Sequence, residues 1–576
     1  MILNLPNIKR DKMTINYNNR NYITDNDLKI SILDSWPRPN IQNKRLKEIF
    51  KDKFGRGFLG GDELVSYSQS LVSHEMEFAK LEEEILNDIE NSENVDFKDI
   101  LFNKTATGIG RGHSLGGLSG VVLGIHGTKM IDSGLTGLCA SRSLVTSSRR
   151  RETGTGDIAI PESLREHPEL LKEYMEISEE VFNLSEKFKD KFGKMGGVET
   201  FNKVIPYNNP ADLLIVLPLD TLSTITSEVK TDKLNPNWKF VPRELHAFSE
   251  MFQEITRCIG QDIMYNQRIE VPRDTYLHYT VFKDPSFPNY ALEKGKEVEM
   301  NINPLVVEVQ KDFTKGFREQ LENLKKMNQE IINIKDPKKL HSQSLKYMYA
   351  LREFSNEYNE ALKVKVSDTL SWRVWSEQKR HATLRQNVES VYSGVNRAYS
   401  NIKPLWDIIE SANSESNLEK LDSILSNIEK NIVIDDRLKK KPEVIMPYIY
   451  HTAKQLMFYG KLIKNKFEPR DALYIVPKNI RLRTLENYDL INLIDLELPL
   501  RLCETCEPER NSSSWKKREV IAEAVPELSY FLKPKCSFGF CTEGRYCKQI
   551  LEMREYDNDL HKKTKEYMLA EARKNI

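Results

Sequence analysis

One succession of segments occurs twice along this chain of 576 residues. A segment rich in Arg and Ser is followed by a long helical stretch and then by an apolar run that ends in Pro. The apolar run covers residues 213–217 before Pro218 in the first half and residues 473–476 before Pro477 in the second half. This shared order predicts a diverged tandem duplication of one domain. The alternative is two unrelated α-rich halves that both happen to end an apolar run with Pro.

The length of the chain also predicts more than one domain, because chains beyond about 250–300 residues usually divide. Alternation of apolar and polar residues predicts strands at residues 28–33 and 305–310. Apolar residues at helical spacing predict helices at residues 44–92 and 316–366, and another that starts at Pro161. The expected divisions are a partly flexible, Asn-rich tail at 1–27, the two copies at 28–300 and 301–500, and a Cys-rich segment with a final helix at 501–576.

The composition suits a globular protein in water, with 39% hydrophobic and 30% charged residues. Lys and Arg together number 85, as do Asp and Glu, so no overall charge draws the chain to nucleic acid or to a membrane. Clusters of cations at residues 149–151 and 439–441 still leave nucleic-acid binding open. No apolar run approaches the roughly 20 residues of a membrane-spanning helix, and the N-terminus lacks the apolar core of a signal peptide. We therefore expect a cytoplasmic protein with no membrane partner.

Five of the seven Cys residues fall in the last quarter of the chain. In a reducing compartment such clustered thiols more often bind a metal or stay free than form disulfides. A Cys-x-x-Cys pair suits structural zinc, which four protein ligands hold in a tetrahedron. An iron–sulfur cluster and free thiols are the alternatives that the loose spacing leaves open. The candidate metal ligands are Cys503, Cys506, Cys536, Cys541 and Cys547.

The second half contains a specific arrangement of Arg, His, Asn and Ser. Arg380 and His381 are followed by Asn387 and then by Ser390. This arrangement resembles the signature of the flavin-dependent thymidylate synthases, which reads Arg-His-Arg, seven residues and then Ser-x-Arg, often with Asn inside the gap. The third and the last Arg of the signature are Ala and Tyr in this chain.

The first half carries other parts of the same signature. Residues 112–114, Gly-His-Ser, resemble the stretch that precedes the signature in the family. Residues 148–150 resemble its Ser-x-Arg end, and Ser147 with Arg149 is an equally good register. Arg142 stands for the last Arg of Arg-His-Arg if the loop is shortened. After the second half, residues 500–503 resemble a Leu-x-Arg element that helps to hold the nucleotide in the family.

The resemblance implies an α+β fold built from two diverged, helix-rich copies of the thymidylate synthase-like domain. It implies an FAD-dependent methyltransferase that moves a methylene group from methylenetetrahydrofolate to carbon 5 of dUMP, with NADPH as reductant. Family members are tetramers with shared sites, which implies a homo-oligomer here, a dimer of fused pseudo-dimers. The Arg-His end of the second half and the Ser-x-Arg end of the first half would then build one asymmetric site.

The residue types in the two segments suit this chemistry. Arg and His beside a flavin ring can hydrogen-bond its carbonyls and favour negative charge on the reduced ring. A Ser hydroxyl and an Arg guanidinium two residues apart can face one phosphate, which Arg binds in a bidentate manner. The implied residues are Arg380, His381 and Arg501 for catalysis, Arg380, His381, Asn387, Arg142 and His113 for the cofactor, and Ser148, Arg149, Arg150, Ser390 and Arg501 for the substrate.

Two other functions are compatible with the sequence. One is flavin-dependent modification of another pyrimidine, free or within nucleic acid. The other is a non-catalytic scaffold held together by a metal ion at the Cys cluster. Each Arg segment also has a plain interpretation as a solvated surface cluster. Trp372 and Trp375, next to the signature, are expected to be core residues rather than a pair that stacks on flavin.

Overall fold

The computed structural model places secondary structure in both halves of the chain. None of the helices in the described part of the chain is long and apolar enough to cross a membrane. The described residues are 15–17, 20–24, 29–74, 80–92, 95–110, 119–135, 142–145, 158–219, 221–222, 239–256, 259–262, 281–286, 293, 302–379, 383–415, 418–541, 543, 547 and 556–574.

The chain divides into two compact units, and each unit is made from three stretches of sequence. Each of the two four-stranded sheets described below uses strands from one half of the chain only. Unit 1 comprises Met1–Phe287, Ser390–Ile424 and Lys441–Asn479, and unit 2 comprises Pro288–Glu389, Leu425–Lys440 and Ile480–Ile576.

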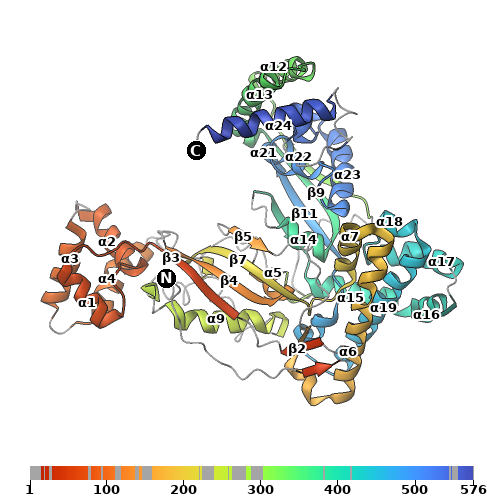
Figure 1. Cartoon of the computed structure of the whole chain (residues 1–576), viewed down its shortest axis with the longest axis horizontal. Coiled ribbons are helices and arrows are strands. Elements are labelled where there is room, and N and C mark those ends of the chain that lie inside the picture. Colours follow the sequence, from red (N-terminus) through yellow and green to blue (C-terminus); the bar gives the residue numbers. More distant parts are fainter. Residues whose placement is uncertain are drawn as a thin grey trace. The chain divides into compact units, whose positions relative to one another are not determined.

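The first four-stranded sheet belongs to unit 1 and is antiparallel throughout, in the order β3-β4-β7-β5 (Figure 1). Apolar side chains alternate along β4 and β7, which gives the sheet one apolar face. On that face Leu123 of β4 pairs with Ile215 of β7, and both side chains are buried. The strands are β3 (Lys29–Trp36), β4 (Gly120–Thr128), β5 (Arg142–Val145) and β7 (Pro210–Pro218).

The second four-stranded sheet belongs to unit 2 and follows the order β10-β11-β9-β8, again antiparallel. Val364 and Val366 of β9 and Tyr488 of β11 contribute to the buried core of this unit. The strands are β8 (Leu305–Lys311), β9 (Leu362–Ser371), β10 (Arg385–Val388) and β11 (Arg481–Asp489).

The two sheets have the same topology, because β3-β4-β7-β5 and β8-β9-β11-β10 are the same order in the two halves of the chain. The first strand of each sheet also carries an irregularity against the second strand. In β3 it falls between Ile32 and Asp34, and in β8 it falls between Val306 and Glu308. A β-bulge is a specific local feature of a strand pair, so the shared bulge fixes how the two sheets correspond.

The bulges set a residue-by-residue correspondence between the sheets. Just before its bulge, β3 pairs with Leu123 and β8 pairs with Val366, so these two residues are equivalent. Leu123 pairs in turn with Ile215, whereas Val366 pairs with Glu486. The second sheet therefore carries a carboxylate where the first sheet carries a branched apolar side chain.

Four helices between β3 and β4 enclose a small apolar core (Figure 1). Asn43 caps the first of them by accepting a hydrogen bond from Leu46 N at 3.1 Å. Gly55 ends the same helix in the left-handed region, with φ of 66°, where a residue without Cβ is favoured. The helices are α1 (Lys44–Phe54), α2 (Gly61–His74), α3 (Leu81–Asn91) and α4 (Phe97–Gly110).

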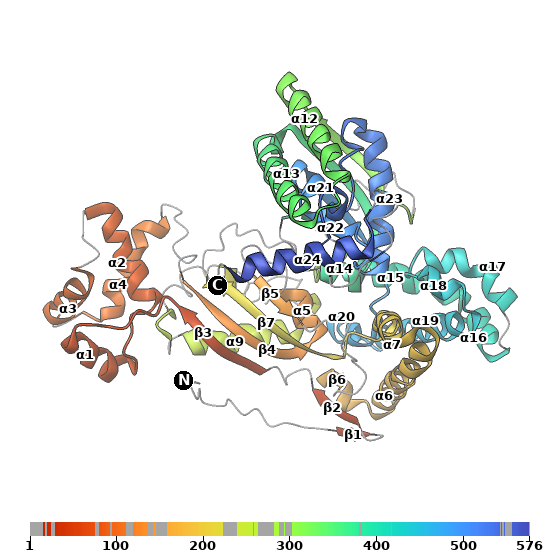
Figure 2. The ribbon, with the colours of Figure 1, turned by 45° about the horizontal axis from the view of Figure 1, so that its top comes forward.

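Long helices from both halves of the chain pack together in unit 1, where α6, α7 and α19 lie side by side (Figure 2). Ion pairs follow this contact, such as Lys454 with Glu180 at 2.6 Å and Lys461 with Glu173. Both α6 and α19 begin with Pro, which suits a first helical position because no hydrogen bond is lost there. The helices are α6 (Pro168–Phe182), α7 (Leu184–Val204) and α19 (Pro442–Lys464).

The two halves also meet through equivalent residues, just before β7 and β11. Pro206 and Pro477 form an antiparallel bridge. Two residues after each Pro, an Asn side chain donates to a helix hydroxyl group. Asn208 Nδ2 donates to a hydroxyl of α6 at 2.9 Å, and Asn479 Nδ2 donates to a hydroxyl of α19 at 2.8 Å. A patch that meets its own counterpart is the pattern of a two-fold interface.

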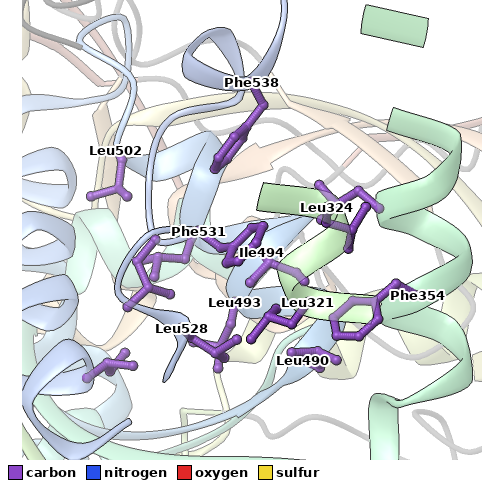
Figure 3. Close-up of a cluster of buried hydrophobic side chains, with 14 of the residues drawn as sticks. Leu321, Leu324, Phe354, Leu490, Leu493, Ile494, Leu502, Leu528, Phe531 and Phe538 are labelled. Carbon is purple, nitrogen blue, oxygen red and sulfur yellow. The ribbon is translucent and has the colours of Figure 1, made fainter. Parts of the chain in front are cut away.

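The core of unit 2 lies between the helices that precede β9 and the chain that follows β11 (Figure 3). Leu324 and Phe354 come from the first group, and Ile494, Phe531 and Phe538 come from the second. α12, α13 and α24 each begin at a side-chain cap, which satisfies backbone N–H groups that lack a partner within the helix. The longer helices are α12 (Lys315–Ile332), α13 (Pro337–Glu357), α23 (Pro508–Ala524) and α24 (Asn558–Arg573).

A further sheet and several short helices complete the described structure. β1 (Ile15–Tyr17) and β2 (Arg20–Thr24), both within the expected tail, join β6 (Ile158–Ile160) in the order β1-β2-β6. The remaining helices are α5 (Lys129–Leu135), α9 (Arg243–Thr256), α14 (Trp372–Gln378), α15 (Val391–Ile402), α16 (Trp406–Glu415), α17 (Leu418–Glu429), α18 (Asp436–Lys439), α20 (Pro469–Ala472), α21 (Leu490–Ile494) and α22 (Glu497–Arg501), with 3-10 turns at Glu162–Glu166, Asn359–Ala361, Lys403–Leu405, Leu473–Ile475, Pro526–Leu528 and Lys535–Phe538.

The α+β class and the strands predicted at residues 28–33 and 305–310 are confirmed. The long helix predicted from Pro161 begins later, because Pro161 precedes a 3-10 turn and α6 starts at Pro168. The two apolar runs that end in Pro are not equivalent. Residues 213–217 lie within β7, whereas Leu473–Ile475 is a 3-10 turn before β11. Both runs are apolar because they are largely buried, and pairing within a sheet decides which becomes a strand.

Candidate active site

The candidate active site is the part of unit 2 around the Arg-His pair of the signature. The structure describes both flanks of this pair, with β9 and α14 on one side and β10 on the other. The residues implied by the resemblance that lie outside the described part of the chain are Arg380, His381, His113, Ser148, Arg149 and Arg150.

Helix α14 leads directly into the Arg-His pair, and its start is fixed at Ser371. The Ser371 hydroxyl accepts a hydrogen bond from Val374 N at 3.2 Å and donates to Glu509 Oε2 at 2.9 Å. Trp372 and Trp375 of this helix are 0% and 2% exposed, which confirms that they are core residues. The cap and the two buried rings hold α14 against the sheet.

Two side chains from β11 and α21 hold the flanks of the pair. Gln378 Nε2, at the end of α14, donates to Glu486 Oε1 at 2.6 Å. Asn492 Nδ2, on α21, donates to the backbone carbonyl of Thr383 at 3.0 Å. We call these hydrogen bonds the two flank contacts.

Glu486 accepts three more hydrogen bonds, all from buried donors. Lys517 Nζ lies 2.7 Å and Tyr488 OH 2.7 Å from its Oε2 atom. Arg510 Nη1 lies 3.3 Å from its Oε1 atom. With Gln378, these residues form the Glu486 cluster, in which four donors surround one carboxylate that is 0% exposed.

The Glu486 cluster keeps its carboxylate ionised. Burial alone raises the pKa of Glu486, because a charged carboxylate loses its water. The ammonium of Lys517 and the guanidinium of Arg510 outweigh this effect and bring the pKa to about 2. The positive side chains therefore hold a permanent negative charge on β11 at neutral pH.

Arg501, the third residue implied for catalysis, joins the same network of charges. Its Nε atom donates to Glu497 Oε1 at 2.8 Å, and the Arg501 side chain is 15% exposed. Glu497 also accepts from Arg510 Nη2 at 3.3 Å, so one carboxylate holds two guanidinium groups. In this structure Arg501 is an ion-pair partner at the edge of the buried network.

The Ser-x-Arg end of the second half has a structural role. Ser390 caps α15: its hydroxyl accepts from Tyr392 N at 3.2 Å and donates to the carbonyl of Lys283. Tyr392, at the family's last Arg, is buried and donates to the carbonyl of Phe240 at 2.6 Å. Asn387 lies half-buried in β10 and pairs there with β11. The Ser390 hydroxyl thus forms both of these hydrogen bonds with backbone groups of the protein.

The sheet register assigns a counterpart to Arg142. Residue 215 of β7 corresponds to residue 486 of β11, so Val216 corresponds to Asn487. Arg142 pairs with Val216 and Arg385 pairs with Asn487. Arg142 is therefore the equivalent of Arg385 on β10, three residues after the position of the third signature Arg.

Counting residues from the ends of β5 and β10 distinguishes the two possible registers of Ser-x-Arg in the first half, Ser147-x-Arg149 and Ser148-x-Arg150. β5 ends at Val145 and β10 ends at its equivalent, Val388. Ser390 is two residues past the end of β10, and Ser147 is two residues past the end of β5. Counting from the strands therefore favours Ser147-x-Arg149 over the register one residue later.

Four Cys residues of the C-terminal segment, Cys503, Cys536, Cys541 and Cys547, lie close enough to influence one another. Burial raises the pKa of the Cys536 thiol to about 12, with further contributions from Cys541, Cys503 and Cys547. Among the residues that the structure describes, no group of three or more His, Cys, Asp or Glu side chains is placed to hold a metal ion. The structure thus lends no support to the zinc ion expected at these thiols and at Cys506.

Known proteins provide a partial match to the chain. No protein-family model matches it. It is similar to the flavin-dependent thymidylate synthase of Pyrococcus abyssi (strain GE5 / Orsay), with 30% identity over 122 residues, 20% of this chain and 50% of that protein. The enzyme of the same name from Thermococcus onnurineus (strain NA1) is 28% identical over 123 residues, again 20% of this chain and 50% of the relative. The chain spans about half the length of these curated relatives, and it is distantly related to them.

The Glu486 cluster was not predicted from the sequence. A signal was present, because Arg510 and Lys517 lie seven residues apart and so share one face of a helix. Glu486 alternates with Thr484 and Tyr488 on the buried face of β11. A charged residue in a strand usually indicates an exposed face, and this expectation hides a buried ion pair.

Proposed function

We propose that the chain is a flavin-dependent thymidylate synthase-like enzyme, which converts dUMP to dTMP with methylenetetrahydrofolate, FAD and NADPH. The distant relationship to curated enzymes of that name supports an enzyme of this type. The observation that carries the proposal is the pair of hydrogen bonds at Gln378 and Thr383, on either side of the Arg-His pair. Its two flanks are fixed by side chains of β11 and α21, as a site that must orient a flavin and a pyrimidine requires.

We also propose that the two halves are diverged copies of one domain. Three independent observations support the duplication: the same strand order, the same bulge in the first strand, and the paired Asn208 and Asn479 after Pro206 and Pro477. Unrelated halves would have no reason to share a bulge at the same register. If two such copies were fused, the interface between them would lie within a single chain.

The two copies would divide the work of the signature. The second half retains Arg380 and His381, but its Ser390 caps a helix instead of facing solvent. The first half lacks the Arg-His pair and retains Ser-x-Arg, for which the strand count favours Ser147 and Arg149. We therefore assign the flavin and the uracil ring to the second half, and the phosphate of dUMP to the first.

The donor types fit this assignment. When bound, reduced FAD would supply the hydride that completes the methyl group. Arg380 and His381 would hydrogen-bond flavin and uracil carbonyls, which stabilises negative charge on both rings. Arg149 would bind the phosphate through two parallel N–H groups. Asn387 and Arg142 stay predicted cofactor residues, together with His113.

The proposal is tested by replacing Arg380 in the full chain. Arg380→Ala is expected to lower flavin-dependent formation of dTMP by about 100-fold, because a lost contact to developing charge costs about 3 kcal/mol. Arg318→Ala, at an exposed Arg of α12, is the matched control and should keep full activity. Equal activity of the two variants would contradict the proposal. Bound FAD without turnover of dUMP in the wild type would instead favour another pyrimidine.

The structural zinc ion stays a prediction that metal analysis can decide. Zinc in equimolar amount, lost in Cys536→Ser, would support it. Protein that contains neither zinc nor iron after purification without chelator would contradict it.

A further inference from the structure

The two flank contacts enclose a short piece of chain. Gln378 is bound to Glu486, and Thr383 is bound to Asn492. Four residues, 379–382, separate the two held positions, and the Arg-His pair is among them. Both partners come from one continuous stretch, β11 followed directly by α21, so neighbouring parts of the chain hold both ends.

The partners are themselves fixed. Glu486 is bound by Lys517 and Arg510, in addition to Tyr488, and is fully buried. Asn492 Nδ2 also donates to Asp489 Oδ1 at 2.8 Å, and the same Asp489 oxygen caps α21 through Asn492 N at 2.9 Å. A side chain held by several hydrogen bonds can fix its neighbour more sharply than a free one.

Stability alone gives a weak reason for the Glu486 cluster. Buried ion pairs often stabilise a fold no more than well-packed apolar residues do. The first sheet illustrates this, since it has Ile215 at the position of Glu486 and keeps the same topology. The half with the carboxylate is also the half with the Arg-His pair, and the half with Ile215 has no such pair. The Glu486 cluster therefore occurs in the same half of the chain as the candidate site.

We propose that Glu486 and Asn492 are positioning residues for the Arg-His pair. Through Gln378 and Thr383 they hold the residues on either side of the four-residue segment, which the proposed reaction requires to be placed against flavin and pyrimidine. The identity of that reaction rests on the proposed function, whereas the holding of the segment rests on the flank contacts alone. Displacement of a reacting group by about 1 Å costs about 100-fold in rate, which sets the expected size of the effect.

Gln378→Met tests the proposal in the full chain. Met has nearly the same length as Gln but donates no hydrogen bond, and Glu486 keeps its three other donors. Tyr530→Phe is the matched control, because it removes one side-chain hydrogen bond, to Asn328 at 2.7 Å, elsewhere in unit 2. Asn492→Ala is the second test variant, since it removes the contact to Thr383.

The first readout is hydrogen–deuterium exchange of the peptide that covers residues 379–384, which needs no substrate. Exchange is expected to rise by about tenfold in Gln378→Met and in Asn492→Ala, with no change in Tyr530→Phe. The second readout is turnover of dUMP, which should fall by about 10- to 100-fold in the two test variants at unchanged KM for NADPH.

The outcomes separate the two proposals. Unchanged exchange in the test variants, or amides that are already unprotected in the wild type, would overturn the positioning role even if the enzyme is active. Raised exchange with unchanged turnover would overturn it as well. If exchange rises in the test variants but the protein binds no FAD, the role of the flank contacts is supported and the proposed reaction is rejected.

Discussion

The two four-stranded sheets share strand order and bulge, but their buried faces differ in chemistry. In the first sheet the face is apolar, and Ile125 and Ile215 lie where the second sheet has Asp368 and Glu486. In the second sheet Lys517 lies between these two carboxylates, at 2.8 and 2.7 Å. The comparison shows that apolar–polar alternation specifies the sheet, while the side chains on the buried face can diverge if every charge finds a partner.

The difference also changes how each sheet depends on single residues. An apolar face loses stability in proportion to the volume removed, because the loss is one of packing. A buried ion network depends on complete pairing, since one missing partner leaves a charge without water or counterion. The second sheet should therefore be more sensitive to the loss of a charge than the first sheet is to the loss of a methyl group.

The largest effect is expected for Lys517→Met. This change leaves Asp368 and Glu486 without their shared cation, and breaking a buried pair costs about 3–5 kcal/mol. Urea unfolding of the full chain, followed by Trp fluorescence to which the buried Trp residues on α14 contribute, measures the loss. Lys516→Met, at the exposed neighbouring Lys, is the control and should cost less than about 1 kcal/mol. A similar loss in the free energy of unfolding for the two variants would show that the second sheet does not depend on its buried charge.

Acid should weaken the second sheet through Glu486. Its pKa is lowered from 4.5 to about 2 on folding, so the folded protein binds fewer protons than the unfolded chain within this range. The stabilisation is present above pH 4.5 and is lost as pH falls toward 2, by about 3 kcal/mol in total. In Glu486→Gln the loss between pH 4.5 and 2 should shrink by that amount. An identical pH profile for the variant would exclude Glu486 as its source.

Which of Arg149 and Arg150 binds the phosphate of dUMP tests the residue-by-residue alignment of the two sheets. The strand count aligns Ser147 with Ser390, so Arg149 should bind the phosphate of dUMP. Loss of one charged hydrogen-bonding partner costs about 1.5–3 kcal/mol, which raises KM for dUMP by about 10- to 100-fold in Arg149→Ala. Arg150→Ala should change KM by less than about threefold. The reverse order would support the register Ser148-x-Arg150 and weaken the strand alignment.

The smallest effect is expected for Ile215→Val. Removal of one methylene group from the apolar face costs about 1 kcal/mol, because the surrounding side chains relax only in part. The thermal midpoint should fall by a few degrees, while flavin-dependent turnover stays at the wild-type level. A loss of turnover would contradict a purely structural role for the apolar face of the first sheet.

The sequence was sufficient to predict the strands at the start of each half, because alternation is a local property, whereas the α+β class came from the resemblance to the family. It did not separate β7 from the 3-10 turn at Leu473–Ile475, since both runs are apolar and sheet pairing decides between them. The Glu486 cluster was also beyond reach. Glu486 and its partners Arg510 and Lys517 each look like surface residues until β11 and α23 are brought together.

An absorption spectrum of the purified protein can decide whether this chain binds a flavin next to a pyrimidine nucleotide, as the proposed function requires. The purified full chain is titrated with FAD and then with dUMP. We expect a bound-flavin spectrum that shifts on addition of dUMP, and we expect this shift to be absent in Arg380→Ala. A protein that binds no FAD, before or after addition of dUMP, would contradict the proposed function and leave only the paired topology of the two sheets.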